Sequence, residues 1–340
     1  MEWNLAGHAW AVQLLKEQLI QDRVRQAYLF TGLPGVGRRT LALAFAMAIA
    51  CPTPIRPGEP CGHCRTCRLI EQQQHPDLDV IQVEAGSREI KVDQIRALEH
   101  RLSLAPYEAR FRIALLLNFQ EANPNAQNAL LKTLEEAPEK VIILLTADAP
   151  EALFPTIVSR CELLRLRPLP LIEAQRYLEG LPGVTPDRAR KLAHLTGGRV
   201  GYARRLLERP DELEKQDAIT SQILELVGAT LRQRFSYAEQ LTRDWGKSRD
   251  NLKQAIQVWL SVWRDVLMCA SGSEAPLVNL EREHELKDIA AIAGPQDTQR
   301  MITLLEEGLH KLEANANPRL LAEVLLMQMP HLDRVTQASD

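Results

Sequence analysis

The sequence has few aromatic residues, no long apolar run and no recognisable secretion signal. Phenylalanine, tryptophan and tyrosine make up 5% of its 340 residues, and together with abundant leucine and alanine this favours helices over an all-β fold. No run of eighteen apolar residues occurs, so we expect no transmembrane helix. The N-terminus has neither the basic nor the apolar segment of a signal peptide, which predicts a cytoplasmic location.

An excess of charge of either sign is also missing. Lysine and arginine together number 41, aspartate and glutamate 44, and the formal net charge is −3. This balance excludes a surface that is basic throughout, although it leaves room for a local basic patch. With 45% hydrophobic and 25% charged residues, the chain has the composition of an ordinary globular protein, and its length fits two or three domains.

The first half of the chain alternates short apolar segments with helical ones. The predicted strands span 27–31, 79–83, 112–117, 141–146 and 162–166. The predicted helices span 39–49, 92–104 and a segment from Pro124, with Asn123 as its N-cap, to the residues before Pro138. Nearly continuous apolar strands that alternate with helices predict a parallel α/β sheet covered on both faces. Ligands of such sheets bind beyond the carboxyl ends of the strands.

The second half of the chain lacks a strand pattern. Residues 171–207 are predicted to form a small helical unit, and the chain beyond Pro210 is predicted to be helical to its end. An apolar stripe at helical spacing consists of Leu252, Ile256, Trp259, Trp263, Val266 and Leu267. The stripe indicates the core of a helical bundle, with a subunit interface as the alternative.

A glycine-rich turn connects the first strand to the following helix, which is the context of a phosphate-binding loop. Its glycines are Gly32, Gly35 and Gly37. A working loop continues with a lysine, which reaches the β and γ phosphates, and a hydroxyl residue, which holds magnesium. Here Arg38 takes the lysine position and Arg39 the hydroxyl position, while Thr40 lies one residue too late. A planar guanidinium does not simply replace a compact ammonium in a tight phosphate cradle.

The strand expected to end in metal-directed and water-activating carboxylates ends instead in Leu117 and Asn118. The loop lacks its lysine and hydroxyl residues, and the strand lacks its carboxylates. Together these two losses indicate a nucleotide-hydrolase fold without its own catalytic residues. Two interpretations of the loop stay open. It still binds ATP or ADP weakly, or it is a tight turn that binds neither.

Four of the six cysteines have the spacing C-x9-C-x2-C-x2-C. They are Cys51, Cys61, Cys64 and Cys67. Four thiolates complete a closed tetrahedral site, so we predict structural zinc, with an iron–sulfur cluster as the alternative. We place His63 and His75 outside the ligand set, and Cys161 and Cys269 are interpreted as ordinary buried residues.

Two further motifs follow in order, NALLKTLEE at Asn128–Glu136 and Ser159-Arg160-Cys161. Together with the glycine turn and the cysteine module, this combination resembles the AAA+ subunits of the bacterial clamp loader, the gamma/tau and delta′ components of DNA polymerase III. The resemblance covers roughly residues 4–207 well and is weaker beyond. The domains that it implies are an AAA+ nucleotide-hydrolase-like core at 1–168 with the zinc module at 51–67, a helical lid at 169–207 and an all-α collar at 208–340.

The resemblance also implies an assembly and a function. Such subunits form a pentamer that opens the ring-shaped sliding clamp and places it on primed DNA, with gamma/tau and delta subunits as partners. The departures at Arg38, Arg39, Leu117 and Asn118 favour the delta′ type, which has no catalytic residues in cis, over an ATP-hydrolysing gamma/tau motor. A stand-alone zinc-dependent nucleic-acid binder is a third reading, which the net charge of −3 disfavours.

Individual residues acquire expected roles from the same resemblance. Arg160 is expected to act in trans as an arginine finger on the nucleotide of a neighbouring subunit. The nucleotide-contacting arginine of the lid falls at Val200, or at Arg199 if the alignment shifts by one residue. Lys132 is expected either to face DNA in the pore or to be solvated. A loose basic group, expected to be solvated surface, contains Arg101, Arg110 and Arg112.

Overall fold

The computed structural model describes residues 3, 5–136, 138–244 and 246–330. The described residues fold into two compact units, Met1–Leu181 with Gly198–Ala203 and Pro182–Gly197 with Arg204–Asp340. The first residues of the predicted core, 1–2 and 4, and the last residues of the predicted collar, 331–340, lie outside the described residues. The division into core, lid and collar stays a prediction.

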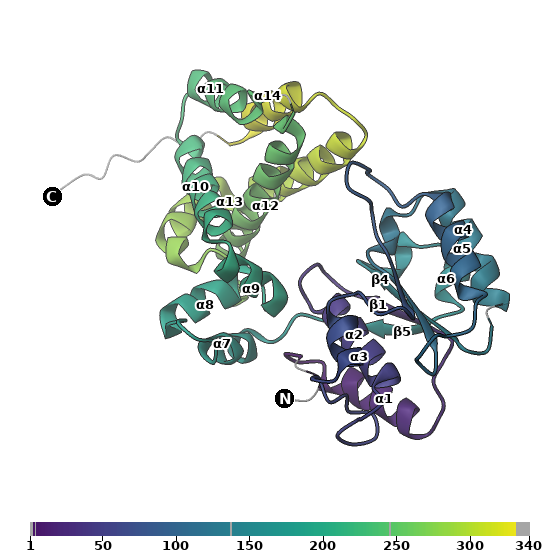
Figure 1. The fold of residues 1–340 in the computed structure, drawn as a ribbon. Helices are drawn as coiled ribbons and strands as arrows, with labels where there is room; N and C mark the ends of the chain where they lie inside the picture. Colours follow the sequence, from purple (N-terminus) through teal and green to yellow (C-terminus); the bar gives the residue numbers. More distant parts are fainter. Residues whose placement is uncertain (1–2, 4, 137, 245, 331–340) are drawn as a thin grey trace. The chain divides into compact units, whose positions relative to one another are not determined.

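The first unit contains a five-stranded parallel sheet (Figure 1). Its strands are β1 Ala27–Thr31, β2 Leu78–Ile81, β3 Arg112–Leu116, β4 Val141–Ala147 and β5 Glu162–Arg165, in the spatial order β2-β3-β4-β1-β5. The predicted parallel sheet is therefore confirmed, and each strand lies within two residues of its predicted bounds. The carboxyl ends of all five strands share one edge of the sheet, which fixes the place of a ligand site.

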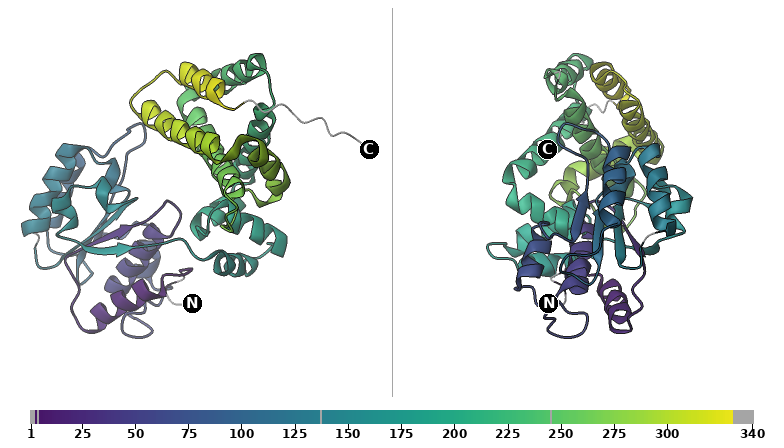
Figure 2. Two further views of the ribbon diagram at one scale, coloured as in Figure 1. Left: turned by 180° about the vertical axis from the view of Figure 1, so that it is seen from behind. Right: turned by 45° about the vertical axis from the view of Figure 1, so that its right-hand side comes forward.

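Helices cover both faces of this sheet, and Figure 2 shows the layers from behind. The helices on one face are α1 Ala9–Ile20, α2 Arg38–Ala50 and α3 Arg65–Glu71, and those on the other are α4 Val92–Leu102, α5 Pro124–Glu136 and α6 Pro155–Val158. Tyr28 and Phe30 of β1 pack with Phe45 of α2, whereas Leu29 packs on the opposite face with Leu130 of α5. Alternate strand residues thus enter two separate cores, which explains why the strands are apolar throughout.

The predicted start of α5 is confirmed in detail. The side-chain oxygen of Asn123 accepts a hydrogen bond from the backbone N–H of Ala126 at 2.9 Å, and Pro124 is the first helical residue. An N-cap of this kind satisfies one of the unpaired N–H groups of a helix end.

Helix α7 Leu171–Glu179 follows the sheet, and the rest of the described chain is helical as predicted. The remaining helices are α8 Pro186–Leu195, α9 Val200–Glu208, α10 Pro210–Val227, α11 Leu231–Thr242, α12 Ser248–Ala270, α13 Glu283–Glu313, which is broken at Gly294, and α14 Pro318–Gln328. The predicted stripe lies on α12, and Leu252, Ile256, Trp259 and Trp263 belong to the core of the helical unit. No helix among the described residues is long and apolar enough to cross a membrane.

A buried arginine connects two helix ends within the helical unit. Arg234 of α11 is 1% exposed and donates to the carbonyl oxygens of Leu226 and Val227, at the end of α10, at 3.0 Å each. It also donates to the carbonyls of Leu326, Met329 and Pro330, at the end of α14, at 3.1, 2.6 and 2.9 Å. The last carbonyls of a helix have no partner within the helix, so one guanidinium satisfies two helix ends at once.

Candidate functional site

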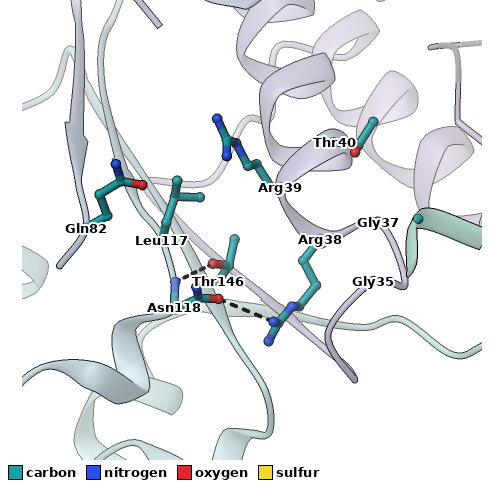
Figure 3. A pocket seen from close by; sticks show the side chains of 10 residues that line it. Gly35, Gly37, Arg38, Arg39, Thr40, Gln82, Leu117, Asn118 and Thr146 are labelled. Carbon is teal, nitrogen blue, oxygen red and sulfur yellow. Dashed lines mark hydrogen bonds between the residues drawn. The ribbon is translucent and has the colours of Figure 1, made fainter. Parts of the chain in front are cut away.

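A pocket of about 230 Å³ lies at the carboxyl ends of the strands (Figure 3). It is lined by Gly35, Gly37, Arg38, Arg39, Thr40, Gln82, Leu117, Asn118, Thr146 and Gly201. Five of the six loop residues named in the sequence analysis therefore line one pocket. The sixth, Gly32, begins the turn, and its N–H donates to the carbonyl oxygen of Asp148 at 3.2 Å.

Glycine is required in the turn itself. Gly35 has a φ of +87°, and a Cβ there would lie 2.8 Å from the backbone nitrogen of Tyr202. The N–H of Gly201, in the first turn of α9, donates to the Gly35 carbonyl at 2.9 Å. Gly37 has a φ of 107° as the N-cap of α2. The turn is thus tight, and the first turn of α9, at Gly201 and Tyr202, lies directly against it.

Arg38, in the lysine position, is occupied by contacts within the protein. Its side chain is 8% exposed, and its Nη1 lies 2.6 Å from a carboxylate oxygen of Asp148. Its Nη2 donates to the side-chain oxygen of Asn118 at 3.3 Å, and Figure 3 shows it pointing toward that residue. The cation that would meet phosphate is therefore paired with a carboxylate just beyond β4.

Arg39, in the hydroxyl position, points away from Arg38 (Figure 3). With the Gln73 amide oriented so that its oxygen faces the donors, that oxygen accepts hydrogen bonds from Nη2 and, at 3.0 Å, from Nε of Arg39. Gln73 lies just after α3, so Arg39 is held toward that helix. A cation stands where a magnesium ligand would be needed, and a cation cannot coordinate another cation.

The strand ends supply polar groups to the pocket, and Asp148, the acid just beyond β4, is paired with Arg38. Asn118 adopts a left-handed conformation with φ 50° and ψ 53°, and its N–H donates to the Thr146 hydroxyl at 2.8 Å. Leu117 is buried. Among the described residues that line the pocket, none is a carboxylate.

Sequence reasoning missed Asp148, Gln82, Thr146 and Gly201. Three of them had a usable signal, because Gln82, Thr146 and Asp148 lie at or just after the ends of parallel strands, which share one edge of the sheet. Gly201 belongs to the segment that the sequence assigned to the lid, and only the fold brings it to the loop.

The structure brings the four predicted cysteines together. The sulfur atoms of Cys51, Cys61, Cys64 and Cys67 all lie within 4.8 Å of one another. Tetrahedral zinc with Zn–S bonds of about 2.3 Å places its sulfurs about 3.8 Å apart, and the Cys61 sulfur lies 3.7 Å from that of Cys51 and 4.0 Å from that of Cys67. Cys51 ends α2 and Cys64 caps α3, so the cluster joins these two helices.

The surroundings of the cluster favour thiolate at one position. Burial raises the pKa of the Cys61 thiol, but hydrogen bonds from the backbone of His63 and Cys64 lower it to about 5. Burial raises the pKa of Cys51 and of Cys67. Thiolate is the form of cysteine that binds metal. A bound metal ion would therefore favour loss of the thiol protons of Cys51 and Cys67.

His75, predicted to lie outside the ligand set, has partners of its own. Its Nε2 lies 3.2 Å from a carboxylate oxygen of Glu108, and its Nδ1 accepts from the N–H of Asp77 at 3.1 Å. Asp77 is 1% exposed and accepts three backbone N–H groups, from Tyr107, Glu108 and Ala109, at 2.6, 2.8 and 2.8 Å. Burial raises the pKa of Asp77, yet these hydrogen bonds lower it below the ordinary value.

Arg160 lies in the turn after α6, with 35% of its side chain exposed. Its Nη2 contacts a carboxylate oxygen of Glu135, near the end of α5, at 2.5 Å. Its Nη1 donates to the carbonyl of Thr156 in α6 at 2.9 Å. The neighbouring Cys161 is half-buried rather than buried as predicted, and burial raises its pKa to about 12. Cys269 is likewise half-buried.

The predicted basic group is paired with acids. Arg101 and Arg112 both contact Asp79, at 2.5 and 3.4 Å, and Arg110 contacts Asp22 at 2.7 Å. Arg112 is 12% exposed, so its interpretation as solvated surface is wrong, because packing beside β2 covers its side chain.

The remaining predicted positions lie as follows. Lys132 is exposed on α5. Val200 is buried, and the Arg199 guanidinium lies over the Tyr202 ring, 4.9 Å from its centre. The assignment of a nucleotide-contacting arginine to either residue stays a prediction.

The chain is similar to known subunits of DNA polymerase III. A family model described as "DNA polymerase III, delta subunit" matches residues 7–170. DNA polymerase III subunit delta′ of Bacillus subtilis is 30% identical over 320 residues, which are 94% of each chain, and that of Pseudomonas aeruginosa is 30% identical over 90% of this chain and 92% of the relative. DNA polymerase III subunit tau of Escherichia coli is 38% identical over 52% of this chain and 27% of its own length. Similarity to the delta′ proteins therefore spans both compact units.

Proposed function

The chain belongs to the DNA polymerase III delta′ subunit family, and on this premise we propose that it works in the clamp loader without hydrolysing ATP itself. We further propose that it supplies Arg160 to the ATP site of a neighbouring subunit. Its partners are the gamma/tau and delta subunits, with the sliding clamp and primed DNA met through the complex, and its location is the cytoplasm.

The pairing of Arg38 carries the proposal that the chain has no ATPase activity. A working loop needs a cation free to meet the β and γ phosphates, and Arg38 is 8% exposed and lies 2.6 Å from Asp148. Arg39 takes the position of the hydroxyl residue that would bind magnesium. Leu117 and Asn118 take the positions where carboxylates would be needed to bind the metal and activate water. Each of these features removes a different part of the hydrolytic machinery.

The proposed role of Arg160 is supported by its position and its chemistry. The side chain is partly exposed in a turn rather than packed into the core, and a guanidinium stays charged at every physiological pH. An arginine finger placed on a γ-phosphate stabilises the charge that develops in the transition state, with effects of about 10³–10⁵ in rate.

We propose that the cysteine cluster holds one structural zinc ion. Cys51, Cys61, Cys64 and Cys67 would be its ligands, and four sulfurs within 4.8 Å of one another fit a closed tetrahedral site. The ion would tie the end of α2 to the start of α3. Metal analysis of the purified chain should give one equivalent of zinc; iron, or no metal, would refute the assignment.

Steady-state ATP hydrolysis tests the proposal. The isolated chain should hydrolyse no ATP, and Arg160→Ala should leave assembly with gamma/tau and delta subunits intact while slowing ATP hydrolysis by the reconstituted complex. Turnover by the isolated chain that is abolished by Arg38→Ala would show an active motor subunit instead. Unchanged hydrolysis by the Arg160→Ala complex would remove Arg160 from the mechanism.

A further inference from the structure

We propose that Glu135 is a positioning residue that orients Arg160 for its action on a nucleotide phosphate held by the neighbouring subunit. The inference rests on the proposed function of Arg160. It adds a second residue, on a different helix, to the part of the chain that acts in trans.

The contacts of Arg160 come from two separate elements. Glu135 lies in the last turn of α5, 25 positions before Arg160 in the sequence, and meets Nη2 at 2.5 Å. The Thr156 carbonyl belongs to α6 and meets Nη1 at 2.9 Å. A planar group fixed at both terminal nitrogens has a defined position and a defined plane.

These contacts leave the guanidinium able to bind a phosphate. Arginine has five N–H donors, and Glu135 and Thr156 each engage one of them. The remaining donors match the oxygens of a phosphate group, for which a fixed guanidinium plane has the right geometry. Glu135 therefore does not have to release Arg160 before the arginine acts.

A purely structural role explains the pair less well. The side chains of Arg160 and Glu135 are 35% and 50% exposed, and ion pairs this accessible to water contribute little to stability. What such a contact changes is the number of orientations of a long, flexible side chain, and orientation matters when the arginine must meet a reacting group. We therefore expect its loss to affect rate more than folding.

The experiment compares four variants in the complex reconstituted with gamma/tau and delta subunits, sliding clamp and primed DNA. Glu135→Gln removes the charge, and Arg160→Ala removes the finger. A double variant combines both changes. Glu136→Gln is the matched control, because Glu136 is the next residue of α5 and is also exposed. Assembly, kcat and the KM for ATP are measured for each.

Glu135→Gln should lower kcat about 3- to 10-fold without changing assembly or the KM for ATP, whereas Glu136→Gln should match the unmodified chain. In the Arg160→Ala background, Glu135→Gln should have no additional effect, since there is no guanidinium left to orient. If Glu135→Gln equals or exceeds the unmodified rate, impairs assembly, or slows the Arg160→Ala complex further, the positioning role is wrong. If Arg160→Ala itself changes nothing, the proposed function fails and this inference fails with it.

Discussion

Each compact unit contains an arginine that is nearly sealed from water, and the two are neutralised differently. Arg38, at the pocket of the α/β unit, is 8% exposed and faces the carboxylate of Asp148, itself 44% exposed. Arg234, in the helical unit, is 1% exposed and donates to five backbone carbonyls. Arg38 meets one carboxylate and the side-chain amide of Asn118 at a pocket, and Arg234 meets the ends of two helices.

This difference distinguishes an arginine that could bind a ligand, Arg38, from one that only stabilises the fold, Arg234. All five N–H donors of Arg234 have fixed partners, so the residue has nothing left to offer a ligand. Arg38 depends on a half-exposed carboxylate, for which another anion could be exchanged. A buried cation therefore indicates a ligand site only when its partner can be replaced, and burial alone does not distinguish the two cases.

The same substitution at both arginines tests this distinction, and the largest effect is expected in the helical unit. Arg234→Met keeps most of the side-chain volume but removes a donor from five carbonyls, four of them buried, and only that of Leu226 keeps a second donor that the structure shows, the N–H of Ala229 at 3.2 Å. The loss should cost about 3–5 kcal/mol. Hydrogen exchange of the amides of α11 and α14 should show faster opening. Arg232→Met, an exposed position on the same helix, is the control and should change stability by less than about 0.5 kcal/mol.

Asp77 provides the inverse case, a buried anion neutralised by three backbone N–H groups. Asp77→Asn should destabilise the α/β unit by about 1–3 kcal/mol at neutral pH. Because the pKa of Asp77 is lowered in the folded protein from its ordinary 3.8, its stabilising contribution is present above that value and is lost as the pH falls through the folded pKa. The difference in free energy of unfolding between the variant and the unmodified chain should become smaller below about pH 4. Urea unfolding measures this difference. A difference in free energy of unfolding that does not depend on pH would show that the charge of Asp77 is not involved.

Asp148→Asn should have a smaller effect on stability and a visible effect on binding. The buried guanidinium of Arg38 would keep the amide of Asn118 but lose its counter-charge, which should cost about 1–2 kcal/mol because Asp148 is half-exposed. The released cation should bind ATP more tightly, by up to about tenfold, since about 1.4 kcal/mol corresponds to a factor of ten. Calorimetric titration with ATP measures this. Unchanged or weaker binding would mean that Asp148 does not compete with phosphate.

The sequence allowed much of this architecture to be predicted because its strongest patterns are local. Parallel strands buried on both faces are continuous apolar segments, so all five strands were predicted within two residues. Cysteine spacing predicted the clustering of the four cysteines for a similar reason, since C-x2-C lets neighbouring sulfurs face one point. Helix α3 was missed, because a segment as short as Arg65–Glu71 shows little periodicity and starts inside the cysteine module.

The ion pair between Arg38 and Asp148 at the pocket could not be predicted from local patterns. Arg38 and Asp148 are 110 positions apart in the sequence, and they meet because β1 and β4 are neighbours in the sheet. The sequence showed that Arg38 takes the place of the lysine of a working loop, but only the fold identifies its partner. Arg160 and Glu135 are a second example, because they come together through the packing of α5 against α6.

The smallest effect should follow from Arg38→Met, the counterpart of Arg234→Met. Removing the guanidinium leaves Asp148 without its partner, but a carboxylate that is 44% exposed is readily rehydrated, and the methionine stem fills most of the vacated space. The cost should stay below about 1 kcal/mol, and any residual ATP binding should be lost with the cation. Hydrogen exchange of β1 and α2 measures the first effect and ATP titration the second. A loss of stability as large as that of Arg234→Met would contradict the distinction between the two arginines, because Arg38 would then be a structural support as well.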